Sequence, residues 1–266
     1  AVPVPVTADG RSDLDAIDPS DVARALCLWV NSPGNPTGAV MNSAQLKELI
    51  ALADQYDFVI ASDECYSELY FDEQHPPVGL LQACAELGRD DFARCVVFHS
   101  LSKRSNLPGL RSGFVGGDAD ILEKFLLYRT YHGGAMSPAV QAASVAAWND
   151  EAHVVDNRRQ YREKFAQVTP VMAQVLDVAL PDAAFYLWAE VPAVFEGRLP
   201  GLTADEAFAR ELLAQYNVTV LPGSYLAREV AGVNPGKSRI RMALVAEPAE
   251  CLEAAGRINA FVFHND

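Results

Sequence analysis

Short apolar runs alternate with helical patterns along the first 117 residues of the chain. Three of these runs predict strands, LCLWV at 26–30, FVIAS at 58–62 and CVVFHS at 95–100, and the first is expected to be buried. SGFVGG (112–117) predicts a further short strand. Because strands alternate with helices, the pattern predicts an α/β fold with a mostly parallel sheet and helices on both faces.

The segment SAQLKELIALADQY (43–56) predicts the first long helix. Ser43 is the expected N-cap, because a hydroxyl there can accept a backbone N–H of the first turn. The helix has one apolar face, made by residues three or four positions apart: Leu46, Leu49, Ile50 and Ala53.

From about Asp118 the pattern becomes mainly helical. A long polar helix is predicted over EAHVVDNRRQYREKFAQV (151–168), and Pro170 is expected to kink or interrupt it. Two later helices, at 203–216 and from near Glu247, are interleaved with the apolar runs FYLWAEV, VTVLPG and SRIRMALV.

This change of pattern predicts two domains. Residues 1–150 are expected to belong to a large domain. Residues 151–266 are expected to form a small α+β domain, joined to the large one by the long helix.

The charge and composition of the chain exclude several kinds of partner. The net charge is −14, so neither nucleic acid nor an anionic membrane surface is expected to bind. No apolar run approaches the length of about 18 residues that spans a bilayer. The opening AVPVPVTADG lacks the basic and long apolar regions of a signal peptide.

Cysteine and histidine usage indicates the compartment and the absence of a metal. The five cysteines are scattered and contain no C-x-x-C pair, which is typical of a reducing compartment, and we expect a cytoplasmic protein. The five histidines show no ligand spacing, so no metal site is expected.

Polar motifs follow three of the predicted strands. NSPGNPTG follows the first strand, DECY the second and SLSK the third. Because ligands in open α/β sheets bind outside the carboxyl ends of the strands, side chains of these loops are expected to face one ligand. The residues concerned are Asn35, Asp63, Tyr66, Ser100, Lys103 and Arg111.

Each residue taken alone has an ordinary structural reading. Lys103 could be a solvated loop lysine, Asp63 a helix cap and Asn35 a turn former. Tyr66 could be a core residue, and a charge such as Arg241 often lies on an edge strand. The functional reading depends on their joint spacing.

The order and spacing of the motifs resemble those of the fold-type I pyridoxal-phosphate-dependent aminotransferases of class I/II. The motifs are N-P-T-G at 35–38, D-x-x-Y at 63–66, S-x-S-K at 100–103, an arginine eight residues after the lysine, and R-x-A-L-V at 241–245. They occur in the family's order over nearly the whole chain. The resemblance implies pyridoxal 5'-phosphate as cofactor, bound mainly by the domain over 1–150.

The resemblance also implies a role for each matching residue. Lys103 binds the cofactor covalently and later acts as general base. Asp63 pairs with the pyridine nitrogen, and a carboxylate there keeps that nitrogen protonated. Asn35 and Tyr66 donate to the phenolic oxygen.

The same resemblance implies which residues bind the anionic groups of cofactor and substrate. Ser100 and Arg111 hold the cofactor phosphate, with help from Ser102, because a guanidinium offers phosphate a bidentate fork. Arg241 binds the substrate α-carboxylate, and Asn35 is implied as a second substrate-binding residue.

Two longer segments, LLYRTYHGGAMSPAVQAASVAAWNDEAHV and VTVLPGSYLAREVAGVNPGKSRIRMALVA, are similar to bacterial succinyldiaminopimelate aminotransferases of lysine and diaminopimelate biosynthesis. This likeness implies glutamate/2-oxoglutarate as one substrate pair and an N-succinyl-2-amino-6-oxopimelate-like compound as the other. Both substrates carry a distal carboxylate, for which Arg129, Tyr131 and Tyr225 are candidates. Each could equally be a packing residue on a helix or loop.

The family pattern also contains a segment before the strand that precedes N-P-T-G, which supplies further phosphate ligands and the aromatic that stacks on the cofactor. The resemblance implies that this segment lies outside the given chain, and that the 266 residues alone are inactive. A homodimer is implied as well.

Other functions stay open at this stage. Another aminotransferase, a C–S lyase or a decarboxylase would share the lysine. A non-catalytic ligand-binding module fused to a DNA-binding domain is also compatible with the motifs.

Overall fold

The computed structural model describes residues 1–7, 11–230 and 232–265. Contacts divide the chain into two compact units. The N-terminal unit comprises Val2–Gly34 and Ala39–Arg158; the C-terminal unit comprises Ala1, Asn35–Gly38 and Arg159–Asp266. The N-P-T-G motif therefore belongs to the C-terminal unit. The limits expected from the sequence, 1–150 and 151–266, stay a prediction.

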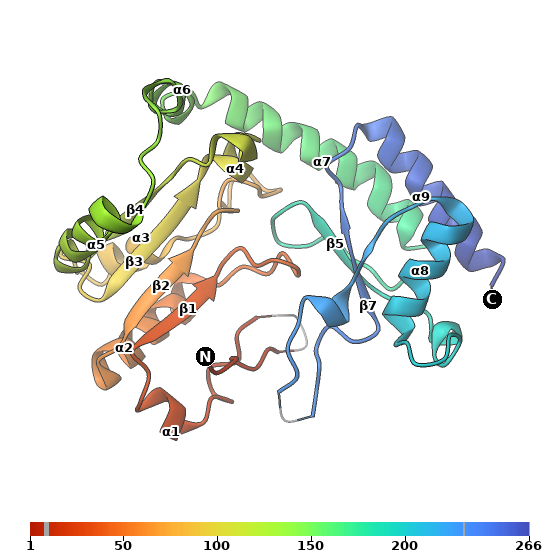
Figure 1. The fold of residues 1–266 in the computed structure, drawn as a ribbon, viewed down its shortest axis with the longest axis horizontal. Coiled ribbons are helices and arrows are strands. Elements are labelled where there is room, and N and C mark those ends of the chain that lie inside the picture. Colours follow the sequence, from red (N-terminus) through yellow and green to blue (C-terminus); the bar gives the residue numbers. More distant parts are fainter. Residues whose placement is uncertain (8–10, 231, 266) are drawn as a thin grey trace. The chain divides into compact units, whose positions relative to one another are not determined.

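A four-stranded sheet forms the centre of the N-terminal unit (Figure 1). Its order is β1 (Cys27–Asn31), β2 (Val59–Asp63), β3 (Cys95–Ser100) and β4 (Gly113–Gly117). The first three strands are parallel, and β4 is antiparallel to β3. This confirms the predicted α/β class with a mostly parallel sheet.

The core of this unit lies between the sheet and helices α2 (Ser43–Tyr56) and α3 (Leu80–Glu86). The four apolar residues predicted for one face of α2 are all buried: Leu46, Leu49, Ile50 and Ala53. They pack with strand residues of the same face, among them Val30, Ile60 and Val97. Removing a side chain such as that of Leu49 would cost about 2–5 kcal/mol of stability.

The expectation that β1 is a buried strand was wrong for one of its faces. Val30 is buried, but Trp29 is 58% exposed and Cys27 is exposed. Among the described residues β1 pairs with β2 alone, so it is an edge strand. Its outward side chains are covered only in part, and Trp29 stacks on Phe98 of β3 with ring centres 5.1 Å apart.

The predicted cap of α2 was also wrong, by one residue. The N-cap is Asn42, whose side chain accepts the N–H of Gln45 at 3.0 Å, while the Gln45 side chain accepts the N–H of Asn42. An asparagine before the serine completes this capping box, so Ser43 becomes the first helical residue. Its hydroxyl donates instead to Glu86 of α3 at 2.6 Å.

Three long helices follow the sheet: α5 (Ala119–His132), α6 (Pro138–Trp148) and α7 (Ala152–Met172), which belongs to the C-terminal unit from Arg159 onward. Pro170 was expected to kink or interrupt the last of them, but α7 continues through it to Met172. The proline removes only one N–H close to the helix end, and Ala173 N still donates to Thr169 O at 2.9 Å. Short helices complete the unit: α1 (Pro19–Val22), α4 (Leu101–Arg104) and η1 (Pro108–Leu110).

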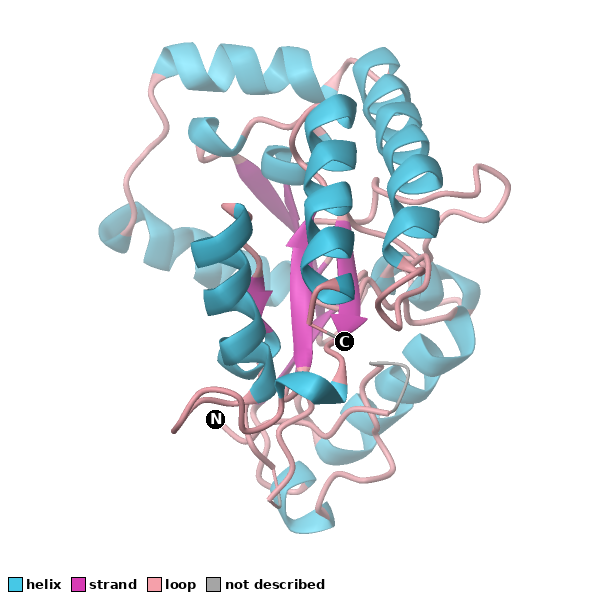
Figure 2. Cartoon of the chain, turned by 90° about the vertical axis from the view of Figure 1, so that its right-hand side faces the viewer, coloured by secondary structure: helices cyan, strands magenta, loops and turns pink. Residues whose placement is uncertain are grey.

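The C-terminal unit has its own antiparallel sheet, in the order β5 (Tyr186–Glu190), β7 (Arg239–Ala243) and β6 (Leu221–Pro222). Figure 2 distinguishes the strands, helices and loops of the chain by colour. Helices α8 (Ala204–Tyr216) and α9 (Pro248–Phe263) belong to this unit, with the short turns η2 (Ala193–Phe195) and η3 (Gly223–Tyr225). Its aromatic core is made by Phe195, Phe208 and Phe261. The predicted small α+β domain is confirmed in its architecture.

The run VTVLPG forms a much shorter strand than expected, only Leu221–Pro222. Just beyond it, the fully buried carboxylate of Asp205 accepts Ser224 N at 2.9 Å. Since Pro222 has no N–H and Ser224 N is already bonded to Asp205, the chain turns away from the sheet after two paired residues.

None of the helices in these described parts of the chain is both long and apolar enough to cross a bilayer.

Candidate functional site

Lys103 lies on α4, the four-residue helix that directly follows β3. Ser100 is its N-cap, and its hydroxyl accepts Ser102 N at 3.0 Å. Leu101 is fully buried and anchors the turn. Lys103 Nζ lies 5.6 Å from the centre of the Tyr66 ring, and Tyr66 is only 6% exposed. The structure therefore brings together two of the predicted catalytic residues.

Asp63 is the last residue of β2, level with Asn31 of β1 and Phe98 of β3. Its side-chain Oδ1 accepts Cys65 N at 3.2 Å. Its backbone oxygen accepts Asn31 Nδ2 at 2.9 Å and Ser32 N at 3.2 Å. Asn31 was not identified from the sequence, although a polar residue that closes an apolar strand is a signal for a strand-end contact.

The residues next to Asp63 have a structural role. Glu64 is buried and is held by Ser62 Oγ at 3.0 Å, Leu80 N at 2.8 Å and His99 Nε2 at 3.3 Å. Burial, reinforced by the Asp63 carboxylate, raises the pKa of the Cys65 thiol to about 12. Cys65 therefore stays protonated at neutral pH, which does not suit a nucleophile.

The two serines of S-x-S-K contact each other, since Ser100 Oγ lies 2.8 Å from Ser102 Oγ. Ser100 Oγ also donates to Ser112 O at 3.3 Å, and Leu101 N donates to the same oxygen at 3.1 Å. These bonds tie the chain next to Arg111 to the end of β3. The guanidinium of Arg111 is exposed and donates to Pro108 O at 2.9 Å, and its backbone is left-handed, with φ 52°.

Asn35 and Arg241 contact each other within the C-terminal unit. Arg241 Nη1 donates to Asn35 Oδ1 at 2.7 Å, and the guanidinium lies 4.4 Å from the centre of the Tyr186 ring. Arg241 is in the middle of β7, opposite Trp188. Gly38 closes the Asn35 motif with φ 73°, and a Cβ there would lie 2.5 Å from Ala183 O. Only glycine fits this position.

The candidates for a distal carboxylate belong to different units. Arg129 and Tyr131 are on α5, where Arg129 Nη2 donates to Gly134 O at 3.3 Å and Tyr131 is 78% exposed. Tyr225 is in the other unit, where a hydrogen bond to Glu206 raises the pKa of its hydroxyl. Their assignment stays a prediction.

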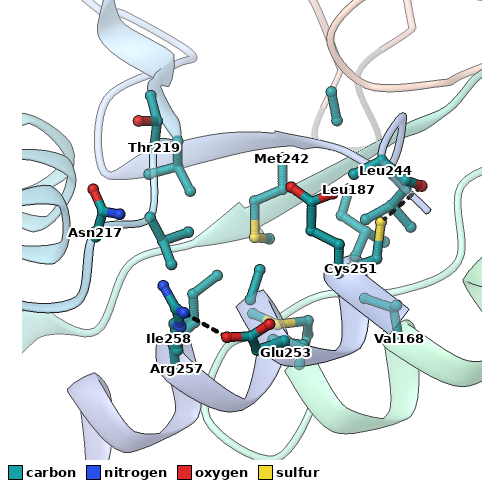
Figure 3. A pocket seen from close by; sticks show the side chains of 18 residues that line it. Val168, Leu187, Asn217, Thr219, Met242, Leu244, Cys251, Glu253, Arg257 and Ile258 are labelled. Carbon is teal, nitrogen blue, oxygen red and sulfur yellow. Dashed lines mark hydrogen bonds and ion pairs between the residues drawn. The ribbon is translucent and has the colours of Figure 1, made fainter. Parts of the chain in front are cut away.

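A cavity of about 490 Å³ lies within the C-terminal unit (Figure 3). Figure 3 shows an apolar lining that includes Met242, Leu187 and Ile258, and a paired Arg257 and Glu253. None of the predicted site residues lines it. The cavity therefore provides no support for the chemistry predicted from the motifs.

The described contacts amount to two local sets of functional groups. In the N-terminal unit a lysine amine lies against a tyrosine, beside a strand-end carboxylate and two hydroxyls. In the C-terminal unit an arginine is bonded to an asparagine amide. An amine can attack a carbonyl, while arginine and hydroxyl groups bind carboxylates and phosphates.

Comparison with known proteins finds similar aminotransferases. A solved aminotransferase of Neisseria meningitidis superposes with a TM-score of 0.87 at 51% identity, covering 96% of this chain and 62% of that one. A probable N-succinyldiaminopimelate aminotransferase of Thermus thermophilus superposes with a TM-score of 0.81 at 29% identity, covering 97% and 64%.

An LL-diaminopimelate aminotransferase of Syntrophobacter fumaroxidans is 33% identical over 255 residues, which cover 94% of this chain and 60% of the relative. The chain thus spans less than two thirds of the length of these relatives. Residues 2–258 match the sequence family described as aminotransferase class I and II. Together with the fold, this match shows that the chain belongs to the class I and II aminotransferases.

Proposed function

We propose that this protein is an aminotransferase that uses pyridoxal 5'-phosphate bound to Lys103. The observation that carries the proposal is the position of Lys103 Nζ, 5.6 Å from the Tyr66 ring centre, just after the strand that pairs with the Asp63 strand. The class I and II family depends on this cofactor. The local donor set fits it, because an amine, a carboxylate, two hydroxyls and a guanidinium match an aldehyde, a ring nitrogen and a phosphate.

When bound, the cofactor supplies an aldehyde for the lysine and a ring that takes up the electron pair left at the substrate Cα. Lys103 Nζ would bind it covalently and then move the proton at Cα as general base. Asp63 would hold a proton on the ring nitrogen, because a nearby carboxylate favours the charged form.

The remaining residues would bind and orient. Ser100, Ser102 and Arg111 would hold the phosphate. Tyr66 and Asn35 would donate to the phenolic oxygen. The bond from Arg241 Nη1 to Asn35 Oδ1 fixes the amide oxygen on the side of the arginine.

For substrates we propose glutamate as amino donor and an N-succinyl-2-amino-6-oxopimelate-like acceptor. The relatives named for diaminopimelate and N-succinyldiaminopimelate support an acceptor of this class. Arg241 would bind the α-carboxylate that donor and acceptor share. A role in lysine biosynthesis is part of this proposal, and the five free cysteines support a reducing, cytoplasmic location.

We also propose a homodimer formed through α5. This helix has no buried residue, and it exposes Leu126 at 68%, Leu127 at 62% and Tyr131 at 78%. An apolar surface of this kind marks an interaction site, and a second copy of the same chain is the partner that the family resemblance implies. Analytical ultracentrifugation of the full-length protein should give twice the chain mass, and Leu127→Glu should shift it to the monomer.

The deciding experiment for the activity gives the full-length protein glutamate and a panel of 2-oxo acids, and measures 2-oxoglutarate. We expect product with a dicarboxylic acceptor, and none with the Lys103→Ala variant. Release of pyruvate or ammonia from an amino acid without an acceptor would indicate a lyase instead. Binding of amino acids without any turnover would indicate a regulatory module.

A further inference from the structure

The carboxyl-terminal end of α4, directly after Lys103, is fastened to the start of α7 by a chain of side-chain hydrogen bonds. Ser105 is the C-cap of α4 and is only 8% exposed. Its Oγ lies 2.8 Å from His153 Nε2, and His153 Nδ1 lies 2.9 Å from Asp150 Oδ2. Both ring nitrogens of His153 are therefore engaged, one with the Ser105 hydroxyl and one with an acidic side chain.

A second set of contacts holds the same end of α4. Arg104 is buried, donates to Ala147 O at 3.0 Å, pairs with Glu151, and lies 5.0 Å from the centre of the Trp148 ring. Asn157 Nδ2 lies 3.5 Å from the backbone oxygen of Lys103 and 3.4 Å from that of Arg104. The Asn157 contacts are long and weak, so the contacts of Arg104 and the chain through Ser105 are the stronger connections.

The direction of the hydrogen bonds follows from the partners. Asp150 is an acceptor, so His153 carries a proton on Nδ1, and the bond to His153 lowers the pKa of the Asp150 carboxyl. Nε2 of the neutral ring then accepts a hydrogen bond from the Ser105 hydroxyl. Ser105 Oγ in turn accepts a hydrogen bond from Arg104 Nη1 at 3.4 Å. The charged groups at this position are Arg104, Asp150 and Glu151.

The order Ser–His–Asp is also that of a hydrolase triad, but Ser105 does not suit a nucleophile. It is buried and caps the helix, where Arg104 Nη1 also donates to its hydroxyl. What the contacts can do is fix the end of the turn that carries Lys103.

We propose that His153 is a positioning residue for Lys103, which it orients through Ser105. The inference rests on the proposed role of Lys103 as the residue that binds the cofactor. Without the contact, Lys103 would still be present, but its amine would be less well held against Tyr66. Cofactor affinity and the pH response of the bound chromophore would then change, beyond any effect on folding.

The test compares His153→Ala, Ser105→Ala and the double variant in the full-length protein. For each, the dissociation constant for pyridoxal phosphate, the pH midpoint of the bound cofactor's absorption change, and the melting temperature are measured. We expect each single variant to weaken cofactor binding about tenfold, the scale of one lost hydrogen bond, and to move the pH midpoint. The double variant should be no worse than either single one, because both break the same chain.

Two further variants separate positioning from general effects. His153→Gln can keep a polar atom near the place of Nε2, and it should restore most of the affinity. His75→Ala is the matched control, since His75 Nδ1 pairs with Asp72 Oδ2 at 2.7 Å at the same spacing but its side chain is 80% exposed. Within the described residues, His75 Nε2 has no counterpart of Ser105, and this variant should behave as the wild type.

Unchanged cofactor affinity and pH midpoint in both His153→Ala and Ser105→Ala would overturn the inference, whether or not the melting temperature falls. Borohydride trapping and peptide mapping of the wild type tell this result apart from a failure of the proposed function. If Lys103 is labelled in the wild type, only the role of His153 is refuted. If Lys103 is not labelled at all, both proposals fall.

Discussion

Arg241 and Asn35, 206 positions apart in the chain, are joined by a hydrogen bond of 2.7 Å from Nη1 to Oδ1. The bond fixes which end of the Asn35 amide faces the arginine, and it uses one of the five N–H groups of the guanidinium. Stacking of Arg241 on Tyr186 further limits its orientation. The two residues thus form one prearranged group, and a change in either should disturb the other.

Arg241→Ala should weaken the amino donor and the oxo-acid acceptor alike, because both present an α-carboxylate. A charge-assisted bond is worth about 1.5–3 kcal/mol, which corresponds to an increase in KM of about 10- to 150-fold for each substrate. Steady-state kinetics of both half-reactions measure this. Arg239→Ala is the control, since Arg239 lies on the same strand but pairs with Glu190 at 3.2 Å. If only one substrate were affected, Arg241 would belong to side-chain recognition instead.

Asp63→Asn should reduce turnover while largely preserving the fold. The amide cannot keep the cofactor's ring nitrogen protonated, and each unit of pKa corresponds to about 1.4 kcal/mol, so a loss of at least about a hundredfold in kcat is expected. The backbone bonds of Asp63 to Asn31 and Ser32 do not depend on the carboxylate, so the melting temperature should change little. Asp57→Asn is a suitable control, because this side chain is 83% exposed. Near-normal turnover of Asp63→Asn would refute the role.

Reduction of the cofactor-loaded protein with borohydride should place the pyridoxyl group on Lys103. Lys164 is the alternative lysine to exclude, because it is buried, at 8% exposure, and likewise lies near a tyrosine, 5.1 Å from the centre of the Tyr161 ring. Peptide mapping by mass spectrometry distinguishes the two lysines. A label on Lys164, or on any lysine other than Lys103, would contradict the assignment.

The parts of the fold that could be predicted from the sequence are those fixed by local patterns. The apolar spacing of α2 predicted its buried face, and the run CVVFHS matched β3 residue for residue. The predictions for Ser43 and Pro170 were wrong because each residue was considered without its neighbours. Asn42 is the better cap, and Pro170 lies so close to the end of α7 that the helix tolerates it.

Properties that depend on distant residues could not be predicted in this way. The exposure of Trp29 follows from the edge position of β1, which periodicity cannot show. The motifs indicated Asn35 and Arg241 separately, but only the structure shows the bond between them. The same holds for His153, whose link to Ser105 spans 48 positions.

Tyr161→Phe should make the C-terminal unit more resistant to alkaline unfolding. Burial, together with the neighbouring Tyr186 and Cys251, raises the pKa of Tyr161 to about 12, whereas the ordinary value is 10.0. The unfolded chain therefore loses this proton first as the pH rises. The stabilisation by the neutral hydroxyl is complete below pH 10 and disappears between about pH 10 and 12.

The size of this effect can be estimated from the same two values. Between pH 8 and pH 11 the wild type should lose about 1.4 kcal/mol of unfolding free energy through Tyr161, and the phenylalanine variant should not lose this share. Stacking of the ring on Phe185, with centres 5.5 Å apart, is kept in the variant. Urea denaturation at both pH values measures the difference, and Tyr128→Phe, with a ring that is 59% exposed, is the control. If Tyr161→Phe and the wild type lost the same free energy, the buried hydroxyl would not be the group that titrates.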